Sequence, residues 1–165
     1  MNRETLYADG GVIGANPSRV GGTWAWRLVD ADGNVLDHAS GDYLCGDIHG
    51  YVPVTNNFTE FLALVKGLKS LPDGWSGLVC SDSAVTLGRL FRGWKMTGIP
   101  TWLVVAGGAA LQRLGPVEHL LLDGHPTRAH LAAGVGKRGN KVSEHNRWCD
   151  EECQRIARDH KAGAA

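Results

Sequence analysis

Thr5-Leu6-Tyr7-Ala8-Asp9-Gly10-Gly11 is the stretch that decides how the rest of this chain is arranged. Its apolar and aromatic residues predict a short strand, and the acid followed by two glycines predicts where that strand ends. Strand alternation puts Leu6 and Ala8 on one face, and Tyr7 and Asp9 on the other. A carboxylate at the end of a buried strand costs desolvation free energy unless another group compensates it. Asp9 is therefore the first candidate for a functional residue.

Length and composition favour one globular domain over residues 1–165, with a core from about residue 5 to residue 160. Hydrophobic residues make up 43% of the chain and charged residues 21%, which argues against global disorder. Lys+Arg and Asp+Glu both number 17, so binding to nucleic acid would need a local basic patch. There is no leader-like start and no apolar run of membrane-spanning length. We expect a cytoplasmic monomer without membrane contact, whose four cysteines are reduced thiols.

The hydrophobic pattern predicts strands at residues 5–9, 23–30, 35–44, 77–81 and 117–122. The same pattern predicts helices at residues 58–71, after Ser83, at 101–114 and at 143–162. Loops are expected at residues 45–53 and 125–143. The first three strands form an antiparallel meander, and helices alternate with the later strands. This order predicts an α/β (α+β) protein with a mixed sheet covered by helices.

Four acids fall where a site would form. Asp9 and Asp82 end strands that we expect to run parallel, and sites in open sheets lie beyond the carboxyl ends of such strands. Glu60 and Asp150 lie near the starts of two helices, from which they can close over Asp9 and Asp82. Any one of these acids could be an ordinary helix cap or strand end, but the combination of four favours a site. Clustered oxygen ligands select hard divalent cations such as Mg²⁺ or Mn²⁺.

The segments around these acids resemble the four acid motifs of the ribonuclease H family, in the family's order. They are Tyr7-Ala8-Asp9-Gly10-Gly11, Thr55-Asn56-Asn57-Phe58-Thr59-Glu60, Ser81-Asp82-Ser83 and His145-Asn146-Arg147-Trp148-Cys149-Asp150. The resemblance covers about residues 5–157. It implies the RNase H fold, with a five-stranded mixed sheet in the order 3-2-1-4-5. It also implies endonucleolytic cleavage of the RNA strand of RNA–DNA hybrids, which leaves 5′-phosphomonoesters.

By this resemblance, the four acids match the family's metal-binding and catalytic residues: Asp9, Glu60, Asp82 and Asp150. They are implied to hold two Mg²⁺ ions, with Mn²⁺ as a substitute. Asp9 is the expected bridging ligand because it comes from the central strand. In such a two-metal mechanism, one ion activates the attacking water and the other stabilises the leaving 3′ oxygen.

Other residues match positions that bind substrate or transfer protons. Asn57 matches a residue that contacts the minor-groove side of the hybrid, and Thr55 and Asn56 lie beside it. His125 matches the family's mobile histidine, which assists proton transfer or product release. Because the loop after His125 is far longer than is usual in the family, His145 is the alternative.

Besides this long loop, the chain departs from the family pattern in three places. Gly11 stands where the family often has Ser, and Ala84 stands where it has a Gln that contacts substrate. Trp94 and Trp102 resemble part of the family's basic protrusion, but the segment between them carries one lysine, Lys95. We therefore expect phosphates to be bound by a different set of basic residues: Lys137, Arg138, Lys141 and Arg147. The alternative is that these residues form only a solvated, charged surface.

Two weaker patterns are set aside. Residues 134–139 spell G-x-G-x-x-G, but no clear strand precedes them and no helix start follows. His145, Cys149 and Cys153 have a spacing that suggests zinc, yet the cysteines belong to an apolar helical stripe, which favours a place in the core.

Two alternatives to hybrid cleavage stay open. One is a resolvase- or transposase-like nuclease of the same fold that acts on structured DNA, and the missing basic protrusion leaves room for it. The other is a hybrid-binding protein without catalysis, against which the four intact acids argue.

Overall fold

The computed structural model describes residues 3–45 and 53–163, so most of the loop predicted at 45–53 lies outside the described residues. Five strands form one sheet in the order β3-β2-β1-β4-β5, which confirms the predicted order. β1 pairs antiparallel with β2 and β2 antiparallel with β3, whereas β4 runs parallel to both β1 and β5. The strands are β1 (Thr5–Val12), β2 (Gly21–Val29), β3 (Val35–Leu44), β4 (Gly77–Ser81) and β5 (Val117–Leu121).

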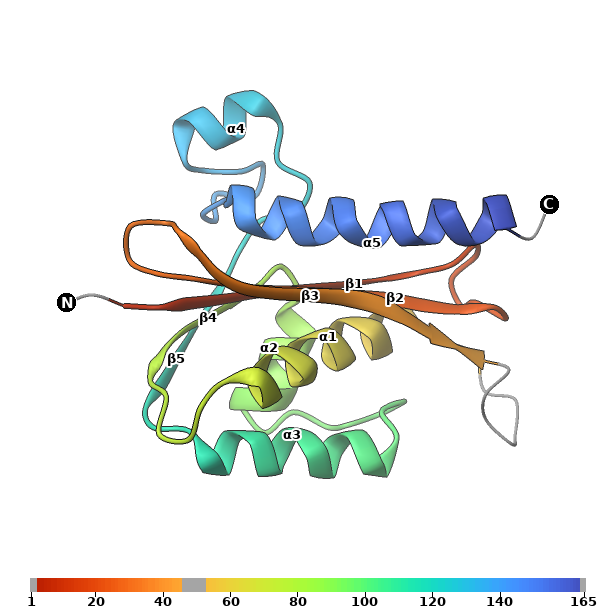
Figure 1. The fold of residues 1–165 in the computed structure, drawn as a ribbon, viewed down its shortest axis with the longest axis horizontal. Helices are drawn as coiled ribbons and strands as arrows, with labels where there is room; N and C mark the ends of the chain where they lie inside the picture. Colours follow the sequence, from red (N-terminus) through yellow and green to blue (C-terminus); the bar gives the residue numbers. More distant parts are fainter. Residues whose placement is uncertain (1–2, 46–52, 164–165) are drawn as a thin grey trace.

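Helices cover both faces of the sheet (Figure 1). They are α1 (Asn56–Ser70), α2 (Ala84–Phe91), α3 (Thr101–Arg113), α4 (Arg128–Ala133) and α5 (Glu144–Gly163). α5 lies on one face, and α1, α2 and α3 lie on the other (Figure 1). Among the residues that the structure describes, no helix combines the length and the apolarity that crossing a membrane requires.

The predicted alternation of β1 is confirmed, and it separates the two halves of the core. Leu6 and Ala8 pack on the α1 side, in a cluster with Leu64 and Leu68 of that helix. Leu6 is fully buried, which is worth about 1.5–3 kcal/mol for a side chain of this size. Tyr7 faces the other way and packs beneath α5. The central strand is therefore apolar on the α1 side, and its polar positions face α5.

β1 does not end at the predicted place. It continues through Asp9 and both glycines to Val12, paired with β2 over its whole length. Its pairing with β4, in contrast, stops at Tyr7. Gly10 is part of the strand, and position 10 needs a glycine because the backbone of α1 comes very close to it. A Cβ on Gly10 would lie 2.3 Å from the carbonyl carbon of Thr59. Because the pairing of β1 with β4 stops at Tyr7, Asp9 lies just beyond the point where the two strands separate.

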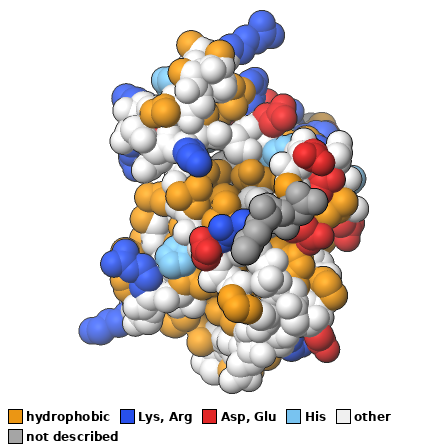
Figure 2. All heavy atoms as spheres, turned by 90° about the vertical axis from the view of Figure 1, so that its left-hand side faces the viewer, with side chains coloured by type: hydrophobic (Ala, Val, Ile, Leu, Met, Phe, Trp, Pro, Cys, Tyr) orange, Lys and Arg blue, Asp and Glu red, His pale blue; other side chains and the backbone are white. Residues whose placement is uncertain are grey.

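The predicted loop at residues 125–143 contains a short helix, α4. Thr127 starts this helix with a reciprocal cap, in which its hydroxyl accepts from the backbone N–H of His130 and the His130 ring accepts from the Thr127 N–H. Gly134 ends it in the left-handed region, at φ 75°. None of the residues of α4 is buried. The helix therefore has no apolar stripe from which it could be predicted in the sequence. The segment forms a lobe above the body of the molecule, with Lys and Arg side chains at its surface (Figure 2).

Candidate active site

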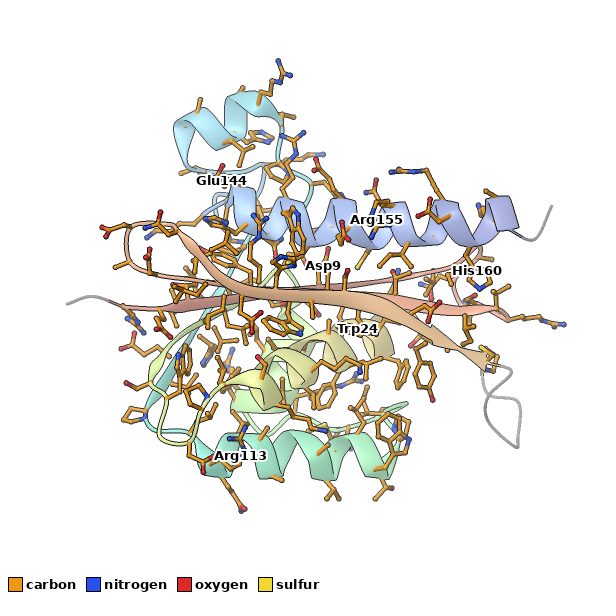
Figure 3. All side chains as sticks on the ribbon, viewed as in Figure 1. Asp9, Trp24, Arg113, Glu144, Arg155 and His160 are labelled. Atoms are coloured by element: carbon orange, nitrogen blue, oxygen red, sulfur yellow. The ribbon has the colours of Figure 1, made fainter. Side chains whose placement is uncertain are left out.

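Three acids from three separate elements converge at the point where β1 and β4 separate. Asp9 comes from β1, Glu60 from α1 and Asp82 from the turn after β4, and one carboxylate oxygen of each lies within 4.8 Å of the others. Asp9 is only 6% exposed. Figure 3 shows it on the side of the sheet that α5 covers, whereas Trp24 lies on the α1 side.

Local hydrogen bonds fix the segments that carry two of these acids. Thr55 caps α1 by accepting from the N–H of Phe58 at 3.1 Å, so the helix begins at Asn56, two residues earlier than predicted. Glu60 therefore lies in the second turn of α1. Ser83 likewise caps α2 through the N–H of Thr86 at 3.2 Å, which holds Asp82 in a tight turn directly after β4.

The environment of the cluster disfavours the charged form of every acid in it. Burial raises the pKa of Asp9 well above its usual value, and the negative charge of Asp82 adds to this effect. Burial also raises the pKa of Glu60 to about 7, although a hydrogen bond from Ser83 acts in the opposite direction. The pKa of Asp82 is raised by burial and partly restored by a hydrogen bond from Asn146. At neutral pH, protons or a bound cation must offset the negative charge of this cluster of three acids. Its donor atoms are all oxygens, which suits Mg²⁺ or Mn²⁺.

The fourth predicted acid, Asp150, borders this group from α5. Its carboxylate contributes to the raised pKa values of both Asp9 and Asp82, so it faces the cluster. Its Oδ2 lies 3.3 Å from Nδ1 of His125. Two buried thiols hold α5 in place beneath it, because Cys149 donates to the Tyr7 carbonyl and Cys153 to the Asp9 carbonyl. These contacts confirm the packing interpretation of the two cysteines.

The two candidate histidines occupy different environments. The side chain of His125 is 78% exposed and lies beside Asp150. It follows Gly124, where a Cβ would come within 2.6 Å of the Asp82 carboxylate, so the glycine lets this turn approach the acids. The His145 ring is largely buried, with Nδ1 3.3 Å from a guanidinium nitrogen of Arg27. Burial lowers its pKa. The geometry therefore brings His125 to the acids and keeps His145 in a packing position.

The predicted substrate contacts at the start of α1 differ in what they do. The Thr55 hydroxyl is used by the helix cap, and the backbone N–H of Asn56 donates to the Asn16 side chain at 3.2 Å. Asn57 is exposed. Of the three, Asn57 is the residue whose side chain faces solvent.

The predicted basic residues also separate into two groups. Lys137 and Arg138 line a cleft of about 560 Å³ whose lining includes Glu60 and Asp82. Lys141 lies outside that lining. Arg147 also lies outside the cleft. It pairs with Glu151 on the surface of α5, with 2.8 Å between Nε and Oε1.

The structure places three of the residues at which the chain departs from the family pattern. Ala84 lines the cleft directly after the turn that carries Asp82. Trp94 packs closely onto α2 at Gly88, where a Cβ would lie 2.2 Å from its ring. The ring of Trp102 stacks on Tyr43 at a centroid distance of 6.4 Å. Both tryptophans therefore make packing contacts in this chain.

Two residues near the acids were not predicted. Asn146 is 2% exposed and donates to Asp82 at 3.5 Å, while its Oδ1 has no hydrogen-bond partner among the described residues. Asp123 is 5% exposed and follows β5. An acid just after a strand is the signal that pointed to Asp82, and it could have pointed to Asp123 as well.

Comparison with known proteins gives a consistent result. No protein-family model matches the chain. A ribonuclease H from Chlorobaculum parvum (strain DSM 263 / NCIMB 8327) is 28% identical over 151 residues, which cover 89% of this chain and 90% of that protein. The N-terminal RNase H domain of Rv2228c from Mycobacterium tuberculosis, solved as a fusion with maltose-binding protein, matches with a TM-score of 0.69 and 20% identity over all of both chains. LC11-RNase H1 in complex with an RNA/DNA hybrid matches with a TM-score of 0.65 and 18% identity over 96% of this chain and 99% of that one. These structural matches show that the chain has the RNase H fold.

Proposed function

We propose that this chain, which its sequence and fold assign to the ribonuclease H family, is a metal-dependent endonuclease. It hydrolyses the RNA strand of RNA–DNA hybrids and leaves 5′-phosphomonoesters. The observation that carries the proposal is the convergence of Asp9, Glu60 and Asp82, from three distant motifs, within 4.8 Å. A relative solved with an RNA/DNA hybrid supports the choice of substrate.

Two Mg²⁺ ions, replaceable by Mn²⁺, are proposed to bind to the four acids: Asp9, Glu60, Asp82 and Asp150. When bound, such ions polarise the scissile phosphate, lower the pKa of the attacking water and stabilise the leaving 3′ oxygen. The chain contributes one buried carboxylate, Asp9, and three that are partly buried. Asp9 is the proposed shared ligand because it is the most buried of the set and lies on the central strand.

The residues around the acids are proposed to handle protons and to orient the substrate. His125 is exposed and adjacent to Asp150, so it can carry a proton to or from the reacting phosphate or help the product to leave. Asn57, with Asn56 and Thr55 beside it, is proposed to contact the minor groove, where the 2′-hydroxyls distinguish RNA from DNA. The phosphates are proposed to bind to basic residues of the lobe: Lys137, Arg138 and Lys141.

One assay tests this function. Matched RNA–DNA, RNA–RNA and DNA–DNA duplexes of one sequence are incubated with Mg²⁺ or with a chelator, and the products are mapped on both strands. We expect cleavage of the RNA strand of the hybrid, with 5′-phosphate ends, only when Mg²⁺ is present. Cleavage of the DNA duplex alone would favour the DNA-acting nuclease, and hybrid binding without cleavage would favour the silent binding protein.

Matched acid variants make the assay specific. Asp82→Asn should abolish cleavage, whereas Asp159→Asn removes an exposed acid that pairs with Arg155 on α5 and should cleave like the wild type. We further propose that residues 1–165 form one domain that acts as a monomer in the cytoplasm, and sedimentation of the purified chain would test the monomer.

A further inference from the structure

The turn between α4 and α5 is wrapped around one buried carboxylate, that of Asp123. Its Oδ2 accepts from the backbone N–H of Arg138 at 2.7 Å and of Asn140 at 3.3 Å, and its Oδ1 accepts from the Asn140 side chain at 2.9 Å. The backbone N–H of Asp123 donates to the Lys141 carbonyl at 2.9 Å. Both carboxylate oxygens are therefore used to hold one turn, and Asp123 is the group on which that turn is built.

The glycines of this turn are required by a close approach at Gly136 and by the backbone conformation at Gly139. A Cβ on Gly136 would lie 2.5 Å from the Asp123 Cβ. Gly139 adopts φ 86°, a conformation that side chains other than glycine rarely adopt. The G-x-G-x-x-G letters at residues 134–139 thus serve a tight turn around a carboxylate, and they do not form a nucleotide-binding loop.

The turn forms one wall of the cleft that holds the acids. Lys137 and Arg138, on the turn, line the same cleft of about 560 Å³ as Glu60 and Asp82. Both basic side chains are exposed, and neither forms an ion pair among the described residues. One wall of the cleft is therefore cationic and the other anionic. This arrangement suits a phosphodiester chain, because the basic wall attracts phosphates directly and the acidic wall would attract them through bound cations.

We propose that Asp123 is a positioning residue, which fixes the turn so that Lys137 and Arg138 bind phosphates adjacent to the one that is cleaved. Asp123 also lines the cleft, but both of its carboxylate oxygens are engaged by the turn, so in this proposal it acts through the two basic residues. The inference rests on the proposed hybrid-cleaving function for its substrate class. It adds a second wall to the site, which the segment between β5 and α5 supplies.

The first test is a comparison of Asp123→Ala with the double variant Lys137→Ala/Arg138→Ala. Both should raise KM, and the Kd for a fluorescent hybrid measured in chelator, by roughly tenfold, the size found for side chains that orient a binding group. Both should also reduce the slope of log Kd against log salt by about one for each phosphate that the variant no longer binds. The value of kcat at saturating hybrid should change less than about twofold, because the acids are untouched.

The triple variant Asp123→Ala/Lys137→Ala/Arg138→Ala decides whether Asp123 acts through the two basic residues. If it does, the triple variant should bind no more weakly than the double variant. Asp123→Asn retains one acceptor oxygen and should restore part of the affinity. It also keeps the test decisive if thermal melting shows that Asp123→Ala does not fold.

Asp30→Ala is the matched control. Asp30 holds the β2–β3 turn in the same manner, since its carboxylate accepts from the backbone N–H groups of Asp32 and Asn34 and from the Asn34 side chain at 2.9–3.0 Å. Asp30 does not line the cleft. Its variant should leave KM, Kd and the salt slope unchanged.

The outcomes separate this inference from the proposed function. If the wild type cleaves hybrid but Asp123→Ala keeps the wild-type KM and salt slope, the positioning role is wrong and the function stands. An effect of Asp123→Ala on kcat alone, an additive triple variant, or an equal effect of Asp30→Ala would also overturn the positioning role. If the wild type binds hybrid without cleaving it, and Asp123→Ala weakens that binding, the function is wrong and the positioning role stands. A wild type that binds none of the hybrid, duplex DNA and single-stranded DNA overturns both.

Discussion

Asp9 lies in surroundings that penalise its negative charge. It is 6% exposed, and its neighbours Glu60 and Asp82 carry the same charge. Two carboxylates about 4 Å apart repel by roughly 4 kcal/mol at an effective dielectric of about 20. The fold tolerates this arrangement because each acid sits on an element that is fixed by apolar packing or by a cap elsewhere. A cation or a proton relieves the repulsion, so the cluster couples ion binding to stability.

The first prediction is that Asp9→Asn lowers cleavage by at least about 100-fold, the size typical of removing one electrostatic interaction at a reacting centre. The same variant should be more stable than the wild type in chelator, because one of the repelling charges is gone. Steady-state cleavage and urea unfolding measure the two effects. Near-normal turnover of Asp9→Asn would show that the acids do not form the catalytic site.

A second prediction concerns pH. Because the pKa of Glu60 is raised from 4.5 to about 7 in the folded protein, the folded state holds this proton more tightly than the unfolded state does. Stability in chelator should therefore be greatest below about pH 4.5 as far as this group is concerned, and it should fall as the pH rises through about 7. The shift from 4.5 to about 7 corresponds to at most about 3.5 kcal/mol, at about 1.4 kcal/mol per pKa unit. Urea unfolding from pH 4.5 to pH 8.5 measures this loss, and Glu60→Gln should reduce it.

A third prediction separates the two histidines. His125→Ala should lower kcat by roughly 10- to 100-fold, at the low end of general acid–base effects, with little change in the melting temperature because the side chain is exposed. His145→Ala should instead lower the melting temperature, because its ring packs against Tyr7 at 5.4 Å. If His145→Ala reproduced the rate defect while His125→Ala did nothing, the proposed role would belong to His145.

At this scale, the sequence predicts residues that lie in short motifs and misses those that depend on a distant turn. Asp9 and Glu60 could be predicted because their flanking residues are distinctive. The place of Asp123 after a strand could have marked it too, but its role could not be predicted, because its partners Arg138 and Asn140 lie 15 and 17 positions away in a segment with no periodic pattern. Asn146 lay within a recognised motif, but its contact with Asp82 follows only from how α5 is seated.

At the scale of elements, the contact between β1 and α1 determines the geometry of the site. Strand periodicity in residues 5–9 predicted β1 correctly, but the two glycines were interpreted as a break. Gly10 instead creates the space into which the backbone of α1 fits, at the level of Thr59. A sequence pattern cannot distinguish a glycine that bends the chain from one that lets another backbone approach. The same contact sets the distance between Asp9 and Glu60.

Gly10→Ala should therefore damage both stability and activity. The added Cβ would meet the Thr59 carbonyl carbon at 2.3 Å and the Glu60 nitrogen at 2.5 Å, so α1 must move. We expect a loss of about 1–3 kcal/mol in the free energy of unfolding, as is typical of overpacking, together with a lower kcat. Gly108→Ala is the matched control, because nothing lies within 4 Å of its Cβ and alanine should stabilise α3 by up to about 1 kcal/mol. Equal stability of the two variants would contradict the close-approach interpretation.

At the scale of the molecule, acids from both halves of the chain meet at one end of the parallel part of the sheet. Asp9, Glu60 and Asp82 come from the first half, and Asp150 of α5 faces them from the second half, where Asn146 also donates to Asp82. The chain has no net charge, so attraction to nucleic acid depends on where its charges are placed. Binding of a cation by these acids would therefore join elements that are far apart in sequence, and it should stabilise the whole fold.

The fifth prediction is that millimolar Mn²⁺ or Mg²⁺ raises the melting temperature. An ion at 100 times its Kd stabilises the folded state by about 2.7 kcal/mol through mass action. Asp9→Asn should show a smaller rise or none, and K⁺ at equal ionic strength serves as the control. A melting temperature indifferent to Mn²⁺ would contradict a cation site formed by the protein alone.

The excursion that carries α4 leaves the body of the protein at Asp123 and returns at Lys141, where the two backbones are joined by a hydrogen bond of 2.9 Å. A detour whose ends touch can be lengthened, shortened or exchanged without moving the strand before it or the helix after it. The four proposed metal-binding acids lie outside the detour, whereas His125, Lys137 and Arg138 lie inside it. Under the proposed function, the phosphate-binding residues are thus carried by a different segment from the acids that would hold the ions. A different loop grafted between these two anchor points, with His125 retained, should therefore change the duplex preference while leaving the four acids in place.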